Sequence, residues 1–277
     1  MAISAADIKK LREATGAGMT DCKNALVEAD GEFEKAVEIL RIKGQKGVAK
    51  REGRAASNGL VALSVTAPGK ATLLELNCET DFVAKSERFI ALADQVVAAA
   101  AEAGANDPKD ITVDGKDLQV ILDEANATLG EKIEVRRVVT LEAAAPGGTV
   151  GTYLHKTNPD LPPQLGVLVA LTGENAEVAK DIAQHVAAFS PLYTAREDVP
   201  EEAVANERRV AREIAIGEGK PEGALDKIVE GRVVGFFKEA VLKEQAFAKD
   251  NKKSVAKVLQ EAGVDVSAFA RFKVGQA

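Results

Sequence analysis

The apolar positions of the first 40 residues predict three short helices. Ile8 and Leu11 share one helical face, and the segment that carries them ends at the glycine-containing turn TGAGM at 15–19. A second helix is expected after this turn, and a third carries apolar residues at i, i+4 and i+7, namely Phe33, Val37 and Leu40. Because about 45 residues form only a small core, we expect a docking module attached to a larger body.

A basic stretch follows this module. Residues 41–54, RIKGQKGVAKREGR, contain six basic residues against one acid and are interrupted by glycines. This composition favours a solvated linker. RNA binding is the alternative, but the formal net charge of the chain is −7 and no aromatic side chains are interleaved with the basic ones. We therefore expect no direct nucleic-acid partner.

From residue 59 the apolar pattern changes to alternation, which is typical of strands. Two alternating runs, 60–66 and 71–78, flank the turn APGK and predict a β-hairpin, and a helix is expected over 86–103. The same kinds of element then recur. Further strands are expected at 133–141, 148–155, 166–172 and 269–275, with a helix at 176–189.

The two strand–helix passages resemble each other. Residues 95–99 (QVVAA) and 184–188 (QHVAA) agree at four of five positions. Alanine-rich helices match readily, but the shared strand–turn–helix order indicates an internal duplication. The predicted fold class is α+β, with a core of two related subdomains built on antiparallel sheets.

Residues 197–248 return to a helical period. The segments 201–217 and 221–248, separated by a glycine- and proline-containing turn, predict an antiparallel helix pair. Its seam is expected to join Val204, Val210 and Ile214 to Ile228, Val229, Phe236 and Val241. Such a hairpin has little to bury except its own seam, so we expect it to project from the body as an interaction arm, which permits a homodimer.

The composition of the chain excludes several classes of protein. The 277-residue chain is 46% hydrophobic and 29% charged, as soluble globular proteins are. Its two cysteines lie far apart without CxxC spacing, so neither a disulfide framework nor a zinc ribbon is available, and it has only two histidines. No apolar run approaches the roughly 20 residues of a membrane span, and the N-terminus lacks a secretory signal. We expect a cytoplasmic protein with no cofactor, no metal and no membrane partner.

No catalytic signature accompanies this composition. The phosphate loop GxxxxGK[ST], the dinucleotide fingerprint GxGxxG, the nucleophile elbow GxSxG and the zinc motif HExxH are all absent from the sequence. Cys22 and Cys78 fall on an apolar helix face and a strand, which favours buried, inert thiols, and His185 is expected at the edge of a core. No active site is therefore visible in the sequence.

The most informative segment is ELNCETDFVAKSERF at 75–89, where a strand ends and a helix begins. Thr80 or Asp81 could cap the helix, and Phe82 could pack on it as a hydrophobic staple. The alternative is an exposed Phe82 that, with the charged Asp81, is directed at a partner. Spacing alone favours the buried aromatic.

Two segments resemble the signature segments of the bacterial elongation factor Ts family. They are LREATGAGMTDCKNAL at 11–26 and ELNCETDFVAK at 75–85, and the likeness extends through YLH at 153–155 and QHVAAF at 184–189. The resemblance implies an N-terminal module similar to ubiquitin-associated (UBA) domains and a coiled-coil hairpin that serves dimerisation in some members. The implied domains are 1–54 for the UBA-like module and basic linker, 55–145 for the N-subdomain of the core, 146–193 plus 243–277 for the C-subdomain, and 194–242 for the hairpin.

The resemblance also implies a function. Members of the family are guanine-nucleotide exchange factors that bind elongation factor Tu, GDP-bound or nucleotide-free, without covalent chemistry of their own. The residues expected to disturb Mg²⁺ coordination in elongation factor Tu are Thr80, Asp81, Phe82 and Val83, and further contacts are expected from Met19, Lys23 and His155. The alternatives are an RNA-associated protein and a helical adaptor whose N-terminal module binds peptides.

Overall fold

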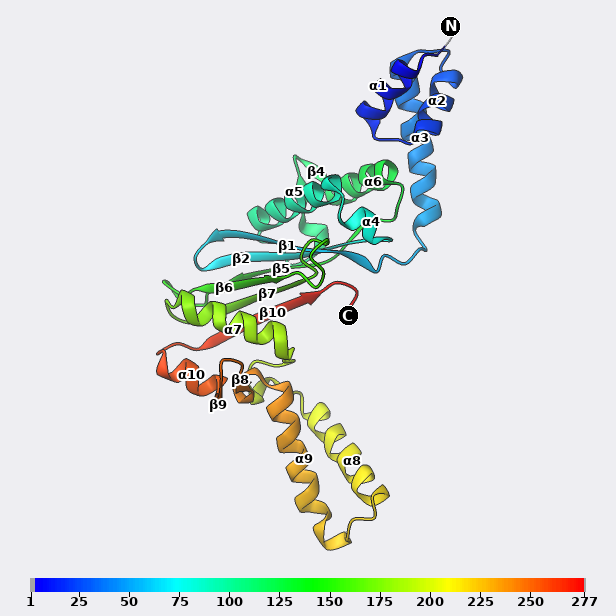
Figure 1. Cartoon of the computed structure of the whole chain (residues 1–277). Helices are drawn as coiled ribbons and strands as arrows, with labels where there is room; N and C mark the ends of the chain where they lie inside the picture. The colour runs from blue at the N-terminus through cyan, green and yellow to red at the C-terminus, as the bar shows by residue number, and fades with distance from the viewer. Residues whose placement is uncertain (1–2, 277) are drawn as a thin grey trace.

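The computed structural model describes residues 3–276, and the side chains of residues 45–50 lie outside that description. The molecule is elongated, with a helical module at its N-terminal end, a body of sheets and helices in the middle and a helical hairpin at the opposite end (Figure 1). Helices and antiparallel strands together confirm the predicted α+β class. None of the described helices is long and apolar enough to cross a membrane.

The N-terminal module contains the three predicted helices, α1 (Ala5–Thr15), α2 (Met19–Glu28) and α3 (Phe33–Arg51). Ser4 and Asp7 form a capping box at the start of α1, and Gly16 ends this helix in the left-handed conformation at φ 71°. The helices enclose a core that consists of Leu11, Cys22, Ala25, Leu26, Ala29, Ala36 and Leu40.

The basic stretch is mostly helical, so the expectation of a linker over 41–54 is wrong for residues 41–51. Helix α3 continues to Arg51 through two glycines that weaken it by up to about 1 kcal/mol each. One of them has a packing role, because a Cβ at Gly44 would lie 2.6 Å from the Cβ of Ala127 on α6 (Leu118–Leu129). Arg51 also donates to the carbonyl of Asn126 at 3.2 Å. Tertiary contact with α6 thus stabilises the helix where local propensity does not; the side chains of Lys46 and Lys50 lie outside the described residues.

The first sheet of the body has the order β1-β2-β5, all antiparallel. Its strands are β1 (Asn58–Ala67), β2 (Lys70–Cys78) and β5 (Glu134–Glu142). Helix α5 (Glu87–Ala103) begins at Ser86, whose hydroxyl accepts from the Phe89 amide, and it packs on one face of the sheet. The other elements of this half are α4 (Asp81–Ala84), η1 (Pro108–Asp110), β3 (Thr112–Val113), β4 (Lys116–Asp117) and α6 (Leu118–Leu129).

The second sheet has the order β10-β7-β6 and is also antiparallel. Its strands are β6 (Val150–His155), β7 (Leu165–Leu171) and β10 (Val266–Lys273), and α7 (Ala176–Phe189) covers its outer face. The remaining elements here are β8 (Ala246–Phe247), β9 (Asp250–Ser254) and α10 (Val255–Glu261). Every residue of β7 is buried, which explains its continuous apolar sequence.

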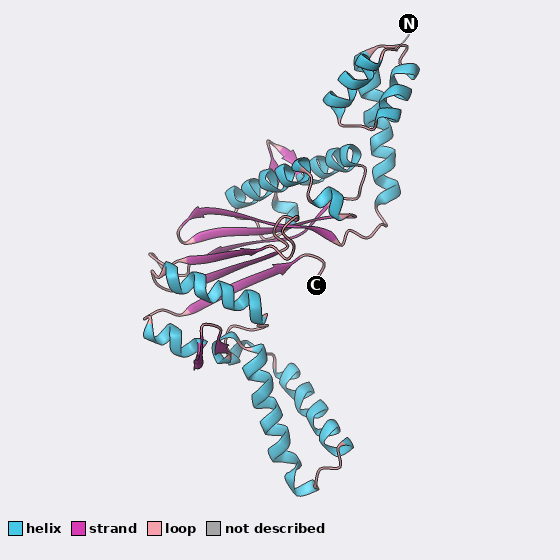
Figure 2. Cartoon of the chain, viewed as in Figure 1, coloured by secondary structure: helices cyan, strands magenta, loops and turns pink. Residues whose placement is uncertain are grey.

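The two sheets stack face to face between their helices (Figure 2). Val61 and Leu73 of the first sheet pack against Leu168 of the second. The approach is close enough that a Cβ at Gly166 would lie 2.6 Å from Val61 Cγ1 and 2.7 Å from Leu73 Cδ1. The body therefore has four layers, helix, sheet, sheet and helix.

The helical hairpin consists of α8 (Glu201–Gly217) and α9 (Leu225–Ala240), flanked by the short helices η2 (Arg196–Asp198), η3 (Glu222–Ala224) and η4 (Leu242–Glu244). The predicted seam is confirmed at Val204, Val229, Phe236 and Val241, which belong to the apolar cluster of the hairpin. It is wrong at Ile214, which is exposed, while Ala211 and Ala215 of α8 are buried. Helix α9 ends eight residues before the predicted 248. The chain there turns back onto the body, where the Leu242 amide donates to the Tyr193 carbonyl and the Leu242 side chain is fully buried.

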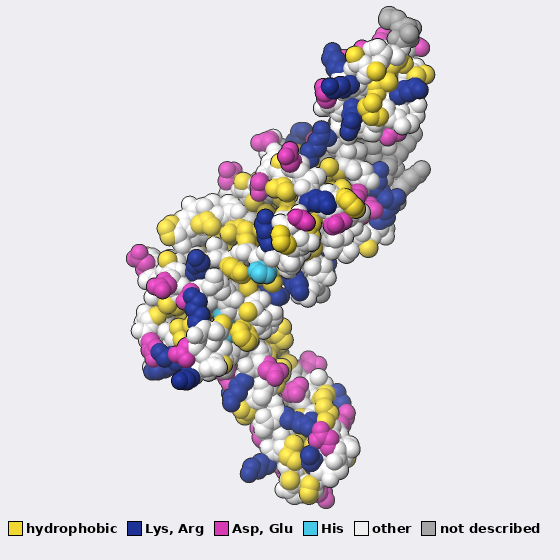
Figure 3. All heavy atoms as spheres, in the orientation of Figure 1, with side chains coloured by type: hydrophobic (Ala, Val, Ile, Leu, Met, Phe, Trp, Pro, Cys, Tyr) yellow, Lys and Arg dark blue, Asp and Glu magenta, His cyan; other side chains and the backbone are white. Residues whose placement is uncertain are grey.

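Basic and acidic side chains are intermixed over the surface of the hairpin (Figure 3). Arg208 pairs with Glu230 and Arg212 with Asp226, in each case from α8 to α9. These exposed pairs each contribute at most about 1 kcal/mol, so the apolar seam contributes most of the stability of the hairpin.

Candidate functional site at the end of β2

Residues 80–83 form a single helical turn between the end of β2 and the start of α5. Thr80 is the N-cap of α4, and its hydroxyl oxygen accepts from the Val83 amide at 3.4 Å. The Ala84 amide donates to the Thr80 carbonyl at 3.2 Å. Thr80 therefore caps this short turn, whereas α5, the helix that Thr80 or Asp81 was expected to cap, is capped by Ser86.

Phe82 extends from this turn into solvent. Its side chain is 72% exposed, and the Lys85 ammonium lies 4.6 Å from the ring centroid. Asp81 beside it is also exposed, whereas Val83 packs against the core of the first sheet and Ala84 is fully buried. The hydrophobic staple suggested by spacing is therefore wrong. One side of the turn is anchored in the core by Val83 and Ala84, and the other side exposes the Phe82 ring and the Asp81 carboxylate.

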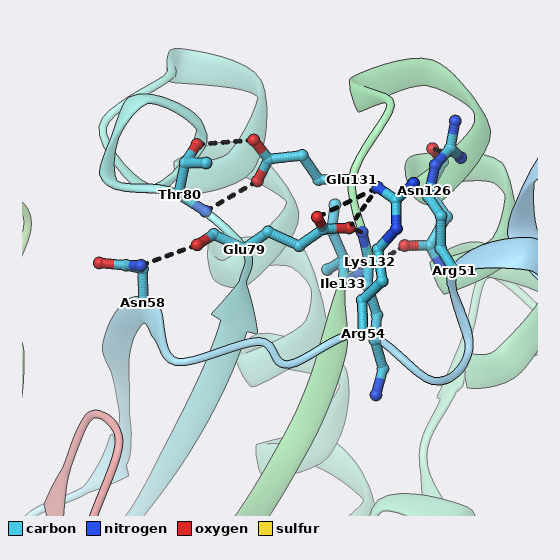
Figure 4. A network of polar contacts seen from close by, with 9 residues as sticks. All are labelled: Arg51, Arg54, Asn58, Glu79, Thr80, Asn126, Glu131, Lys132 and Ile133. Carbon is cyan, nitrogen blue, oxygen red and sulfur yellow. Dashed lines mark hydrogen bonds and ion pairs between the residues drawn. The ribbon is translucent and has the colours of Figure 1, made fainter.

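Two carboxylates connect this turn to the segment between α6 and β5 (Figure 4). Glu131 accepts from the Thr80 amide at 3.0 Å and from the Thr80 hydroxyl at 2.6 Å. In the opposite direction, Glu79 accepts from the Lys132 amide at 2.7 Å. Arg54 adds an ion pair to Glu79 at 3.2 Å.

The pKa values of two side chains beside the turn, Glu79 and Cys78, are shifted by their surroundings. The hydrogen bond from the Lys132 amide holds the pKa of Glu79 below its ordinary value. Burial raises the pKa of the Cys78 thiol to about 12, and the charge of Glu131 acts in the same direction. The protonated Cys78 thiol donates to the Thr80 carbonyl at 3.1 Å. Cys78 is therefore an inert, buried thiol, as predicted, and not a nucleophile.

The other predicted contact residues lie on different elements. Met19, 49% exposed, and Lys23, also exposed, are on α2 in the N-terminal module. His155 is exposed at the end of β6, where its Nδ1 shares a hydrogen bond of 3.0 Å with the Tyr153 hydroxyl. The structure does not gather these residues and Phe82 into one pocket. They form separate points on the surface of an elongated molecule, an arrangement suited to contact with a large partner.

A shallow cavity of about 190 Å³ lies beside His155 and is lined by Tyr153, His155, Leu165, Gln184, Ala187 and Ala188. At the end of α7, close in sequence to this lining, Phe189 and Leu192 are exposed. Sequence reasoning missed both of them, since one apolar residue at a helix end carries no local signal of exposure. It also missed Glu131, which lies 51 residues from Thr80.

His185 has the structural role that the sequence predicts. It is fully buried, its Nδ1 accepts from the Ala248 amide at 3.1 Å, and its Nε2 therefore carries the hydrogen that faces Gln245 Oε1 at 2.8 Å. Burial lowers the pKa of His185. Among the residues that the structure describes, no group of three or more His, Cys, Asp or Glu side chains is placed to hold a metal ion.

Comparison with known proteins identifies the family. A family model described as "Elongation factor TS" matches residues 79–276. Elongation factor Ts of Acidothermus cellulolyticus is 59% identical over 274 residues, which cover 98% of this chain and 98% of the relative. The proteins of the same name from Kineococcus radiotolerans and Streptomyces coelicolor are each 58% identical, over 277 and 278 residues, with at least 98% of both chains covered. The chain belongs to the elongation factor Ts family.

Proposed function

We propose that this chain binds elongation factor Tu in its GDP-bound state and promotes release of GDP, so that GTP can replace it during polypeptide elongation. No bond is made or broken by the chain itself. The observation that carries the proposal is the exposed ring of Phe82 on an anchored helical turn. Burial of such a ring in a partner contributes about 2 kcal/mol or more, which is enough to separate groups that otherwise pack together.

The turn 80–83 supplies the exchange activity in this proposal. Phe82 enters between two helices of elongation factor Tu, and Asp81 brings a negative charge close to the Mg²⁺ site. Mg²⁺ requires near-ideal octahedral geometry, so a small displacement of its ligands weakens its binding strongly. Without Mg²⁺ the diphosphate loses its main counter-charge, and GDP dissociates faster.

The other predicted contact residues, Met19, Lys23 and His155, enlarge the interface with elongation factor Tu. Met19 and Lys23 of the UBA-like module, residues 1–54, meet the nucleotide-binding domain of elongation factor Tu, and His155 of the C-subdomain, residues 146–193 plus 243–277, meets another of its domains. The N-subdomain, 55–145, carries the active turn. The hairpin, 194–242, is a coiled coil through which two copies of the chain can dimerise.

Release of the exchange factor follows from linkage. If this chain weakens nucleotide binding to elongation factor Tu by a given factor, nucleotide weakens binding of this chain by the same factor. GTP in excess therefore displaces the chain from elongation factor Tu, and the chain is ready for another cycle.

The test is stopped-flow release of a fluorescent GDP from Mg²⁺-loaded elongation factor Tu. We expect acceleration that rises with the concentration of this chain and that falls at least about tenfold in Phe82→Ala, since residues at the centre of an interface contribute 2 kcal/mol or more. Val65→Ala is the matched control, because Val65 is 55% exposed on β1 and is not part of the proposed contact.

The stability of Phe82→Ala separates a contact role from a core role. A fully buried Phe→Ala substitution costs about 3–5 kcal/mol. The Phe82 ring is 72% exposed, so we expect about 1 kcal/mol or less from this substitution. Full exchange activity of Phe82→Ala, or no acceleration by the unmodified chain, would contradict the proposal.

A further inference from the structure

We infer that Glu131 is the positioning residue of the exchange site, and that it sets the orientation of the turn that carries Asp81 and Phe82. This inference rests on the proposed exchange function, which assigns activity to the turn. Glu131 is half-buried, and both of its carboxylate oxygens bind Thr80. It acts on the turn through Thr80.

Both oxygens of the Glu131 carboxylate bind the same residue. Oε2 accepts from the Thr80 amide at 3.0 Å and Oε1 accepts from the Thr80 hydroxyl at 2.6 Å (Figure 4). Because the hydroxyl hydrogen is directed to Glu131, the lone pairs of the same oxygen are free to accept from the Val83 amide. A continuous chain of hydrogen bonds therefore runs from Glu131 through Thr80 into the first turn of α4.

The turn needs such an anchor because it is short. Helix α4 has four residues, and a single helical turn is not stable without external contacts. Its free amides lie at its N-terminal end, where Thr80 supplies the cap. Ala84 holds the far end of the turn in the core. Glu131 holds the near end, so Asp81 and Phe82 lie between two fixed points.

Glu131 is itself held in place by its neighbours. Gly130, at φ 77°, ends α6 and directs the chain toward β5. The Lys132 amide then donates to Glu79, and the Ile133 amide donates to the side chain of Asn126. Each of the two segments thus supplies a carboxylate that accepts from a backbone amide of the other. Glu79 at the end of β2 accepts from Lys132, and Glu131 between α6 and β5 accepts from Thr80.

The core of this half does not depend on Glu131. The buried cluster beneath the turn is apolar and includes Leu76, Ala84, Phe89 and Val96, whereas Glu131 is half-buried at its edge. Removal of the carboxylate should therefore leave the fold intact and loosen only the turn. It also leaves the surfaces of Met19 and His155 unchanged, so affinity for the partner should fall much less than the rate of nucleotide release.

The first measurement is GDP release from elongation factor Tu, followed as a function of the concentration of this chain. For Glu131→Ala we expect the rate at saturation to fall about tenfold to one-hundredfold, as two charge-assisted hydrogen bonds are lost, with the half-saturating concentration changed less than about threefold. Glu131→Gln keeps one acceptor oxygen and should retain an intermediate rate. Glu124→Ala is the control, since Glu124 is an exposed residue of α6 paired with Lys116, and it should release GDP at the unmodified rate.

A double-mutant cycle tests whether Glu131 acts through Thr80. Thr80→Val removes the hydroxyl at nearly constant volume. If the two residues act as one unit, the variant with both Glu131→Ala and Thr80→Val should be no slower than the slower single variant. Effects on the saturating rate that multiply would show that Glu131 acts independently of Thr80 and would overturn the inference.

A second readout does not involve elongation factor Tu at all. The chain contains no tryptophan, so Phe82→Trp introduces a single indole that reports motion of the turn by time-resolved fluorescence anisotropy. We expect the added Glu131→Ala to increase fast local motion of the indole, and the added Glu124→Ala to leave it unchanged. Unchanged indole motion in Glu131→Ala would refute the positioning role whatever the exchange rates show. Absence of acceleration by the unmodified chain, with increased indole motion, would instead refute only the exchange function.

Discussion

Loss of one partner of the buried ion pair between Glu75 and Arg137 is expected to be one of the most destabilising single changes in the body. Glu75 on β2 is fully buried, and its Oε2 accepts from Arg137 Nε on β5 at 2.7 Å. Its Oε1 accepts from the Gly275 amide at 3.1 Å. Arg137 also donates to the Lys273 carbonyl at 3.2 Å. One guanidinium therefore joins the first sheet to the end of β10 in the second.

Arg137→Met removes the guanidinium and leaves the buried carboxylate without its counter-charge. Loss of one partner of a buried ion pair costs about 3–5 kcal/mol. The Arg137 side chain is 26% exposed and the Gly275 amide remains in contact with Glu75, so we expect the lower end, about 3 kcal/mol. With an unfolding entropy of about 2.1 cal/mol/K per residue, this loss corresponds to a fall in the melting temperature of about 5 °C for 277 residues.

Urea unfolding followed by circular dichroism measures this loss, and a second variant identifies its cause. If the cost comes from an uncompensated charge, the variant that combines Glu75→Met with Arg137→Met should be more stable than Arg137→Met alone, because no charge is then buried. A loss below about 1 kcal/mol in Arg137→Met, or a double variant less stable than the single one, would refute the reasoning.

Two further predictions concern buried positions of the second half. Because burial lowers the pKa of His185, the folded state binds its proton less readily than the unfolded state, so stability should fall as the pH drops below the ordinary histidine pKa of about 6.5. In His185→Gln the urea midpoint should depend less on pH between 7 and 5.5, and an unchanged dependence would assign it to other groups. A Cβ at Gly151 would lie 2.4 Å from the backbone of Ala179 on α7, so Gly151→Ala should cost about 1–3 kcal/mol in thermal melting. The control is Gly231→Ala in α9, where nothing lies within 4 Å of the added Cβ and the change should stabilise the helix by up to about 1 kcal/mol; equal effects of the two would contradict the close-contact explanation.

The sequence predicts those parts of the fold that depend on contacts between near neighbours. The hairpin of β1 and β2 follows from alternation on both sides of the turn APGK, and the register pairs Val65 with Ala71 across it. Helix α5 begins where Ser86 provides a cap. In both cases the periodicity of the apolar residues and the chemistry of the turn or cap indicate the same structure.

The errors occur where distant contacts decide the structure. Glycines at 44 and 47 predict a break after Leu40, but packing of Gly44 against Ala127 lets α3 continue to Arg51. The assignment of Ile214 to the hairpin seam is wrong for a related reason, since closely packed helices bury small side chains such as Ala211 in place of the larger Ile214. A single sequence does not specify how closely two helices approach, so it does not specify these choices.

At the turn 80–83, the structure contradicts the burial of Phe82 that residue spacing predicts. Only the resemblance to a known family suggested that Phe82 is exposed. In the structure the Phe82 ring is in contact with water, whereas the amide, the hydroxyl and the carbonyl of the nearby Thr80 all form hydrogen bonds. An exposed aromatic on a loose turn would lose side-chain and backbone freedom when it entered a partner, and that loss would weaken binding. With Glu131 and Glu79 already holding the turn, much of this ordering takes place when the chain folds, so the ring can meet its partner in a fixed orientation. The hydrogen bonds around Thr80 therefore support the binding role of the exposed Phe82 ring, and their loss should weaken the effect of that ring on the partner.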